Sequence, residues 1–215
     1  FTVEILDAEA DNIPPDEVAA LAVEKEPSLI AVVVYGHQPS ASTQNMPAAG
    51  AICSDIKRLD SATKLLLVGG HVAALPERTL REEDVDFVCS GEGPYTLVEL
   101  LAALQGGRAE DLQKVRGLWY WDGANVRANP PSPTVRNLNE EMPEVAWDLL
   151  PMDKYRAHNR HCFGGISREP YGAIYTTLGC PYRCSFCCIQ APFKSGEGIL
   201  GFGENVNSYR FWSPD

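Results

Sequence analysis

The sequence predicts an α/β fold built on an open parallel sheet, and three features of its first half support this prediction. Apolar, β-prone runs alternate with segments of helical periodicity. Two of these runs, 29–35 and 65–68, are continuously apolar, as expected for strands that are buried on both faces. Glycine follows both runs, which suits a tight turn after a strand. Right-handed βαβ units, with helices on both faces of the sheet, are the expected result.

The expected elements follow one another in strict alternation. Residues 14–17 open the first helix with proline and two acidic side chains, which suit the positive end of the helix dipole. Gly106 and Gly107 end the last helix of the series. The predicted elements, in order, are strand 2–6, helix 14–26, strand 29–35, helix 46–59, strand 65–68, helix 77–82, strand 86–88 and helix 94–105.

The second half of the chain has a different organisation. Residues 118–126 predict a β-hairpin with an Asp-Gly turn, and the proline-rich stretch 129–151 predicts an extended linker. An apolar run at 171–178 predicts a strand. We therefore expect three parts: an α/β domain at 1–107, a hairpin and linker at 108–170, and the start of a second domain at 171–215.

Composition limits the classes of partner. The formal net charge is −11, and residues 1–107 carry 6 basic against 17 acidic side chains, whereas the remainder is balanced. An acidic first half argues against nucleic acid, because phosphate binding needs a basic face. The seven cysteines are an odd number, and no apolar stretch is long enough for a signal peptide or a membrane span. We therefore expect a cytoplasmic protein with reduced thiols.

Three cysteines stand close together directly after the predicted strand at 171–178. Cys180, Cys184 and Cys187 have C-x-x-x-C-x-x-C spacing. Three thiolates from one loop can hold three irons of a [4Fe-4S] cluster and leave the fourth iron open to a substrate or cosubstrate. Zinc ligands and plain buried thiols are the alternatives. Structural zinc sites usually pair C-x-x-C units or add histidines, and no such partner follows Cys188.

This loop resembles the signature of the radical S-adenosylmethionine (radical SAM) superfamily, with Phe186 as its aromatic residue. The resemblance implies that SAM chelates the open iron beside Phe186, and that the reduced cluster cleaves SAM to a 5′-deoxyadenosyl radical. It also implies a (β/α) barrel. This chain is expected to carry only the first strand and the cluster loop of that barrel, and therefore to be inactive by itself.

Three loops follow the predicted strands at the edge of the sheet where open α/β folds bind ligands. They are rich in glycine and small polar residues, so that the backbone can approach a bulky ligand. The alternative is that these glycines only make tight turns. The candidate ligand-binding residues are Gly36, His37, Ser40, Gly69, Gly70, His71, Gly91, Glu92 and Gly93.

Residues 67–71, the run 86–93 and the helix after it resemble the cobalamin-binding domain of B12-dependent radical SAM proteins. The resemblance implies a Rossmann-like, flavodoxin-like domain over 1–107 that lacks its first strand and helix, with cobalamin against the nine candidate residues. His71 is expected to line the pocket or to be an ordinary surface or hydrogen-bonded histidine, in preference to a cobalt ligand.

Together the two resemblances imply a cobalamin-dependent radical SAM enzyme that transfers a methyl group to an unactivated carbon. Its cofactors would be a [4Fe-4S] cluster, SAM and cobalamin, and its partners a small-molecule substrate and a reductant such as flavodoxin or ferredoxin. Two alternatives stay open. One is a B12 radical SAM enzyme that does not methylate, of the oxidative cyclase or ring-contraction type. The other is a B12-binding module without catalysis.

Overall fold

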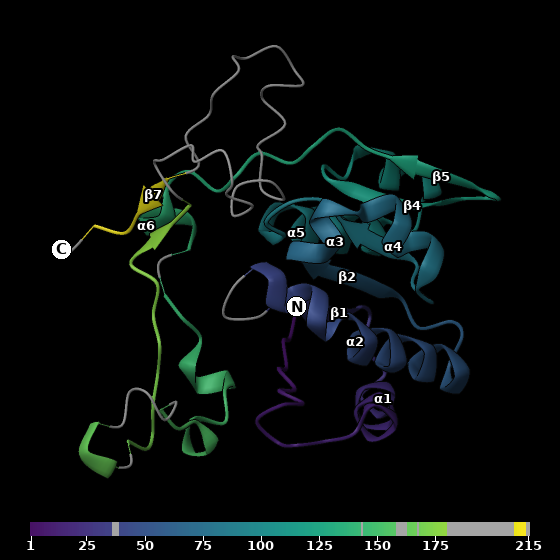
Figure 1. Cartoon of the computed structure of the whole chain (residues 1–215). Helices are drawn as coiled ribbons and strands as arrows, with labels where there is room; N and C mark the ends of the chain where they lie inside the picture. Colours follow the sequence, from purple (N-terminus) through teal and green to yellow (C-terminus); the bar gives the residue numbers. More distant parts are fainter. Residues whose placement is uncertain (36–38, 143, 158–162, 167, 180–208, 214–215) are drawn as a thin grey trace.

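The structure is a computed structural model that describes residues 1–35, 39–142, 144–157, 163–166, 168–179 and 209–213. Its main body is a five-stranded sheet with the strand order β1-β2-β3-β4-β5 (Figure 1). The strands are β1 (Ile30–Val34), β2 (Leu65–Gly69), β3 (Phe87–Cys89), β4 (Leu118–Asp122) and β5 (Asn125–Ala128). The α-helices are α1 (Pro15–Glu24), α2 (Pro39–Leu59), α3 (Gly70–Ala74), α4 (Pro76–Glu82), α5 (Pro94–Gly106) and α6 (Leu138–Glu141).

The sheet is mixed. Strands β1, β2 and β3 are parallel, which confirms the parallel arrangement predicted for this part of the chain. The predicted hairpin forms β4 and β5, and β4 pairs antiparallel with β3, so the hairpin extends the sheet instead of lying in a linker. The predicted α/β fold is therefore confirmed, with a parallel sheet over β1, β2 and β3, and the sheet as a whole is mixed because the hairpin joins it. The residue bounds of the three predicted parts stay predictions.

Two hydrophobic layers hold the helices to the sheet, and β2 supplies side chains to both. Leu65 and Leu67 lie in one core cluster, with buried residues of α1, α2, α3 and α4. Leu66 and Val68 lie in the other, with buried residues of α5. All four side chains are almost fully buried. Alternation along a strand that is covered on both faces explains why this segment is continuously apolar.

Two predicted strands are wrong for most of their length. Residues 2–6 form no strand, and the neighbouring apolar side chains of Phe1, Val3 and Ile5 are 69%, 60% and 46% exposed. A strand needs a hydrogen-bonding neighbour, and among the described strands β1 pairs only with β2. Of the run 171–178, only β6 (Thr177–Leu178) is a strand, and it pairs antiparallel with β7 (Arg210–Phe211).

The other described elements, one before β4 and the rest after β5, are short. Helix α6 and strand β7 lie side by side and are not part of the main sheet (Figure 1), and the Trp212 indole N–H donates to the carbonyl of Met142, 2.8 Å away. The short 3₁₀-helices are η1 (Ala109–Lys114), η2 (Trp147–Leu149), η3 (Met152–Lys154) and η5 (Phe163–Gly165). None of the described helices combines the length and apolarity that crossing a bilayer requires.

Candidate cofactor-binding edge

The carboxyl ends of β1, β2 and β3, with the residues that follow each strand, form one edge of the sheet, which we call the carboxyl edge. Val34 at the end of β1 lies in register with Gly69 at the end of β2, and β3 ends at Cys89. The two predicted loops that the structure describes, after β2 and after β3, therefore lie along one edge. Gly36 and His37 lie outside the described residues, and Ser40 lies in the first turn of α2.

Gly69 brings the backbones of β1 and β2 into close contact. A Cβ on Gly69 would lie 2.3 Å from the carbonyl oxygen of Val34 and 3.2 Å from its side chain. No side chain fits at that distance without moving a strand, so packing alone already requires glycine here. Gly70, directly after it, is buried and begins α3.

Hydroxyl groups of α2 tie this edge together. The Ser42 hydroxyl donates to the carbonyl of Val34 at 2.5 Å and accepts from the backbone N–H of His71 at 3.0 Å. The Thr43 hydroxyl lies 3.1 Å from Nδ1 of His71. His71 is thus a hydrogen-bonded histidine, as the sequence allowed. Ser42 and Thr43 were not predicted, because no pattern in the sequence distinguishes them from other polar residues of the helix.

The loop after β3 combines a glycine in a conformation that residues with side chains rarely adopt and free space next to a second glycine. Gly93 has φ +108°, and a Cβ there would come within 3.1 Å of the Val68 side chain. Gly91 is buried, yet apart from the atoms of Gly91 and its two chain neighbours no described atom lies within 4 Å of the position that its Cβ would take. Ser90 donates from both its backbone N–H and its hydroxyl to the carbonyl of Gly117, at 2.8 and 3.1 Å. The loop is therefore fixed to β4 while it leaves space beside Gly91.

Glu92 points to protein partners. Its carboxylate accepts from the backbone N–H of Val135 at 2.9 Å and from the Arg210 guanidinium at 2.8 Å. The side chains of Glu92 and Arg210 are only 16% and 9% exposed. The predicted contact of Glu92 with cobalamin stays a prediction, but the structure gives this carboxylate a different set of neighbours.

Tyr35 is a residue of the carboxyl edge that the sequence did not single out, because it ends an apolar run. Its backbone carbonyl accepts from the side-chain amide of Asn45 at 2.9 Å. Burial of the hydroxyl, followed by the charges of Cys89 and Glu92, raises the pKa of Tyr35 to about 12. The phenol therefore stays protonated at neutral pH, while the Tyr35 residue as a whole is 43% exposed.

The predicted cluster ligands Cys180, Cys184 and Cys187, and the predicted SAM contact Phe186, lie outside the described residues. Within the part of the chain that the structure describes, no three His, Cys, Asp or Glu side chains gather as metal ligands. The described residues on either side of the cysteine segment are those of β6 and β7, which pair with each other.

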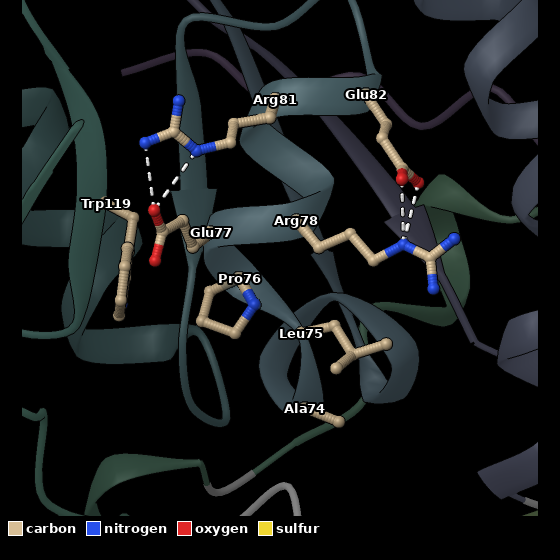
Figure 2. A pocket seen from close by; sticks show the side chains of 8 residues that line it. All are labelled: Ala74, Leu75, Pro76, Glu77, Arg78, Arg81, Glu82 and Trp119. Carbon is tan, nitrogen blue, oxygen red and sulfur yellow. Dashed lines mark hydrogen bonds and ion pairs between the residues drawn. The ribbon is translucent and has the colours of Figure 1, made fainter. Parts of the chain in front are cut away.

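A separate hollow of about 530 Å³ lies at the corner between α3 and α4 (Figure 2). Its charged groups are already paired along α4, Arg81 with Glu77 and Arg78 with Glu82, each at 2.9 Å. The Arg81 guanidinium also lies 5.7 Å from the centre of the Trp121 ring. Because these cations already have partners, the hollow offers a ligand less than the carboxyl edge does.

Comparison with known proteins shows the family of the part of the chain that carries this edge. Residues 1–101 match the family of the B12 binding domain. The chain contains a B12-binding domain. This domain is homologous to that of B12-binding radical SAM enzymes, because the similarity to the relatives described next runs through it and beyond it.

Two curated relatives and one solved structure resemble most of the chain. An uncharacterized methyltransferase of Pyrococcus horikoshii is 33% identical over 192 residues, which cover 89% of this chain and 38% of that protein. An anaerobic magnesium-protoporphyrin IX monomethyl ester cyclase of Synechocystis is 27% identical over 86% of this chain and 34% of its own length. The cobalamin-dependent SAM radical enzyme OxsB, solved with aqua-cobalamin and SAM bound, superposes with a TM-score of 0.63 at 21% identity, over 99% of this chain and 25% of that one.

The chain thus spans between a quarter and two fifths of the length of these relatives. Within this span, the carboxyl edge of the B12-binding domain fits its cofactor in one respect that the structure itself provides. Corrins are bulky, and the backbone at Gly91 has space beside it that no described side chain occupies. The hydroxyls of Ser42 and Thr43 and the ring of His71 add polar groups along the same edge.

Proposed function

We propose that the carboxyl edge binds cobalamin as part of a cobalamin-dependent radical SAM enzyme, and that this enzyme transfers a methyl group to an unactivated carbon. The observation that carries the proposal is the match of residues 1–101 to the B12 binding domain, and the space that the described residues leave beside Gly91 at the carboxyl edge supports it. The methyltransferase of Pyrococcus horikoshii, similar to 89% of this chain, supports the choice of reaction.

In this proposal the residues of the chain hold and orient the cofactors. Cys180, Cys184 and Cys187 bind a [4Fe-4S] cluster and Phe186 contacts SAM, while the carboxyl edge holds the corrin. Bound in this way, the cluster with SAM supplies a radical and cobalamin supplies the methyl group. The work of the protein is to position the reacting groups and to exclude water. Its proposed partners are a small-molecule substrate and a reductant such as flavodoxin or ferredoxin.

The experiment separates the two cofactor sites in the full-length protein, purified without oxygen from cells supplied with cobalamin. Gly91→Val fills the space at the edge, and we expect cobalt content to fall at least tenfold while iron content stays constant. Cys184→Ala removes one cluster ligand, and we expect the reverse pattern. A Gly91→Val protein with the wild-type cobalt content would refute the assigned edge. A Cys184→Ala protein that keeps its cluster and cleaves SAM normally would refute the radical SAM assignment.

A non-methylating B12 radical SAM enzyme is a second candidate, because the cyclase of Synechocystis is similar to 86% of this chain. The two candidates differ in the fate of the SAM methyl group. Reaction of the full-length enzyme with methyl-labelled SAM and substrate places the label in the product if the enzyme is a methyltransferase. Product formed without label, together with 5′-deoxyadenosine, favours the cyclase or ring-contraction type. Cobalamin binding with neither product favours a binding module.

A further inference from the structure

A segment far along the chain from the B12-binding domain lies against its carboxyl edge. Residues 132–142, which we call the strap, follow β5 and include α6. Val135 and Leu138 of the strap are each 1% exposed, so the strap is packed into the protein. The hydroxyl of Tyr95, at the start of α5, donates a hydrogen bond to the carboxylate of Glu141, near the C-terminal end of the strap. The strap is therefore anchored to the domain beside the β3–α5 loop.

Glu92 joins three separate parts of the chain at one point. It belongs to the β3–α5 loop, and its carboxylate accepts from Val135 of the strap and from Arg210 of β7. Arg210 also donates to the carbonyl of Val135 at 2.5 Å, so that Glu92, Val135 and Arg210 are each hydrogen-bonded to the other two. Two guanidinium N–H groups reach the two carboxylate oxygens, an arrangement that fixes orientation as well as distance.

Arg210 stands at the base of the cysteine segment. It pairs in register with Leu178, two residues before Cys180. The two ends of the segment that contains the cysteines are therefore held together by β6 and β7, and Arg210 ties that base to Glu92. Gly91 and Gly93, on either side of Glu92, belong to the proposed cobalamin edge. One residue thus links the bases of both proposed cofactor sites.

Further contacts hold β7 on the same strap. The Trp212 indole donates to the carbonyl of Met142, and the backbone N–H of Ser213 donates to the side chain of Asn139 at 3.0 Å. These two contacts, which involve no charged group, help to attach β7 to the strap. The Glu92–Arg210 pair is the charged contact of β7, and it is largely shielded from water. A shielded ion pair orients its partners strongly, because breaking it leaves an unpaired charge away from water.

We infer that Glu92 is a positioning residue that holds β7, and with it the β6–β7 pair that flanks the cysteines along the chain, against the carboxyl edge, and that its carboxylate does not bind the corrin. The inference rests on the proposed function, since it concerns the distance between the two cofactors that this function requires. Close positioning of reacting groups is a large part of catalysis, and a displacement of about 1 Å can reduce a rate by about a hundredfold. Loss of Glu92 should therefore uncouple the two sites without emptying them.

The test uses Glu92→Gln in the full-length protein, and Glu99→Gln as its matched control. Glu99 is on the neighbouring helix α5, and its carboxylate also accepts from a backbone N–H and a guanidinium, both of Arg116. Within the described residues, its carboxylate forms no hydrogen bond or ion pair with the strap or with β7. Cobalt and iron contents are measured first, followed by the magnetic coupling between the reduced cluster and cob(II)alamin by pulsed electron paramagnetic resonance.

We expect Glu92→Gln to keep cobalt and iron within twofold of wild type, to broaden or lose the coupling, and to lower product formation at least tenfold while SAM cleavage continues. The double variant Glu92→Arg/Arg210→Glu should recover at least part of the coupling. Glu99→Gln should leave all three quantities unchanged. An unchanged coupling in Glu92→Gln overturns the inference, and so does a tenfold loss of cobalt with intact coupling, which would make Glu92 a cofactor contact.

Failure of the proposed function is recognised separately, in the wild-type protein, as the absence of cobalt or iron. Hydrogen exchange of β7 in the cofactor-free full-length protein then still tests the attachment. Glu92→Gln should speed exchange of the amides at 210–212 at least tenfold, whereas Glu99→Gln should not. Equal exchange in both variants would show that Glu92 does not hold β7, and would overturn the inference without reference to either cofactor.

Discussion

The two ends of the three parallel strands are built by different means. At the amino ends, Asp86 accepts from the backbone N–H of Leu65 at 2.8 Å and from Lys57 at 2.7 Å, and Lys57 also donates to the carbonyl of Thr63 at 2.7 Å. At the carboxyl edge, glycine backbone and the Ser42 hydroxyl make the corresponding contacts. Charge closes the amino end, whereas at the carboxyl edge small residues shape the ends of β1 and β2, and a charged pair, Glu92 with Arg210, follows β3.

The difference teaches where a ligand can enter. Polar atoms at the amino end are occupied by fixed protein partners, and Lys64 adds a second, longer ion pair with Asp86 at 3.4 Å. The carboxyl edge is close-packed only where Gly69 meets Val34, and it has space beside Gly91. Binding sites of open α/β sheets are found at this edge. The same sheet thus separates a purely structural end from an end that is suited to a cofactor.

The largest effect is expected when the close contact at the carboxyl edge is disturbed. Gly69→Ala places a methyl group 2.3 Å from the Val34 carbonyl, where backbone on both sides resists movement. Overpacking of this kind costs about 2–3 kcal/mol. Urea unfolding of the protein, monitored by circular dichroism, should give this loss as a lower midpoint with an unchanged slope.

Gly91→Ala on the same edge is the control, because no described atom lies near its Cβ position. Its free energy of unfolding should stay within about 0.5 kcal/mol of wild type. Equal destabilisation by both substitutions would mean that the two glycines do not differ in packing, and would remove the distinction between the tight and the spacious part of the edge.

The next largest effect is expected at the amino end. Asp86→Asn keeps the shape of the side chain but leaves Lys57 without its counter-charge, and the two side chains are only 22% and 19% exposed. Partly shielded charged hydrogen bonds of this kind contribute about 1–2 kcal/mol. Glu82→Gln is the control, because Glu82 and Arg78 are 56% and 64% exposed. Exposed helix pairs contribute about 0.5 kcal/mol or less. A loss of equal size in both variants would contradict the view that charge closes this end.

Hydrophobic patterns within short stretches of the sequence predicted several strands and helices of this fold. Continuous apolar runs located β1 and β2, and helical spacing located α2 and α5. The edge where a ligand would bind followed from the parallel topology, since carboxyl ends of parallel strands share one edge. The spacing of Cys180, Cys184 and Cys187 predicted a cluster, and that stays a prediction because these residues lie outside the described structure.

Long-range pairing was beyond such patterns. The apolar residues of 2–6 have strand-like composition, but composition does not supply the neighbouring strand that a ladder requires. The hairpin was predicted, yet its pairing with β3 was not, because the turn fixes only the register between β4 and β5. Glu92 and Arg210 are 118 positions apart, and no periodicity connects them. Ion pairs of this kind follow from the assembled fold.

The smallest effect concerns a thiol beneath the amino end. Cys53 on α2 is fully buried, and burial, followed by the charges of Glu83 and Asp84, raises its pKa from 9.0 to about 12. The folded state therefore keeps the proton that the unfolded state releases above pH 9. The stabilisation from this thiol is complete below pH 9 and is lost progressively as the pH rises from 9 toward 12.

Between pH 8 and pH 10 this loss amounts to about 1 kcal/mol, since each pH unit above the lower pKa contributes at most about 1.4 kcal/mol. Urea unfolding of wild type and of Cys53→Ala at the two pH values measures the contribution of the Cys53 thiol. Alanine does not titrate, and both proteins carry the same other titratable groups. Wild type should lose about 1 kcal/mol more than the variant. Equal losses would mean that Cys53 ionises in the folded state. Water would then reach the core behind Lys57 and Asp86, and the amino end would not be the closed end of the sheet.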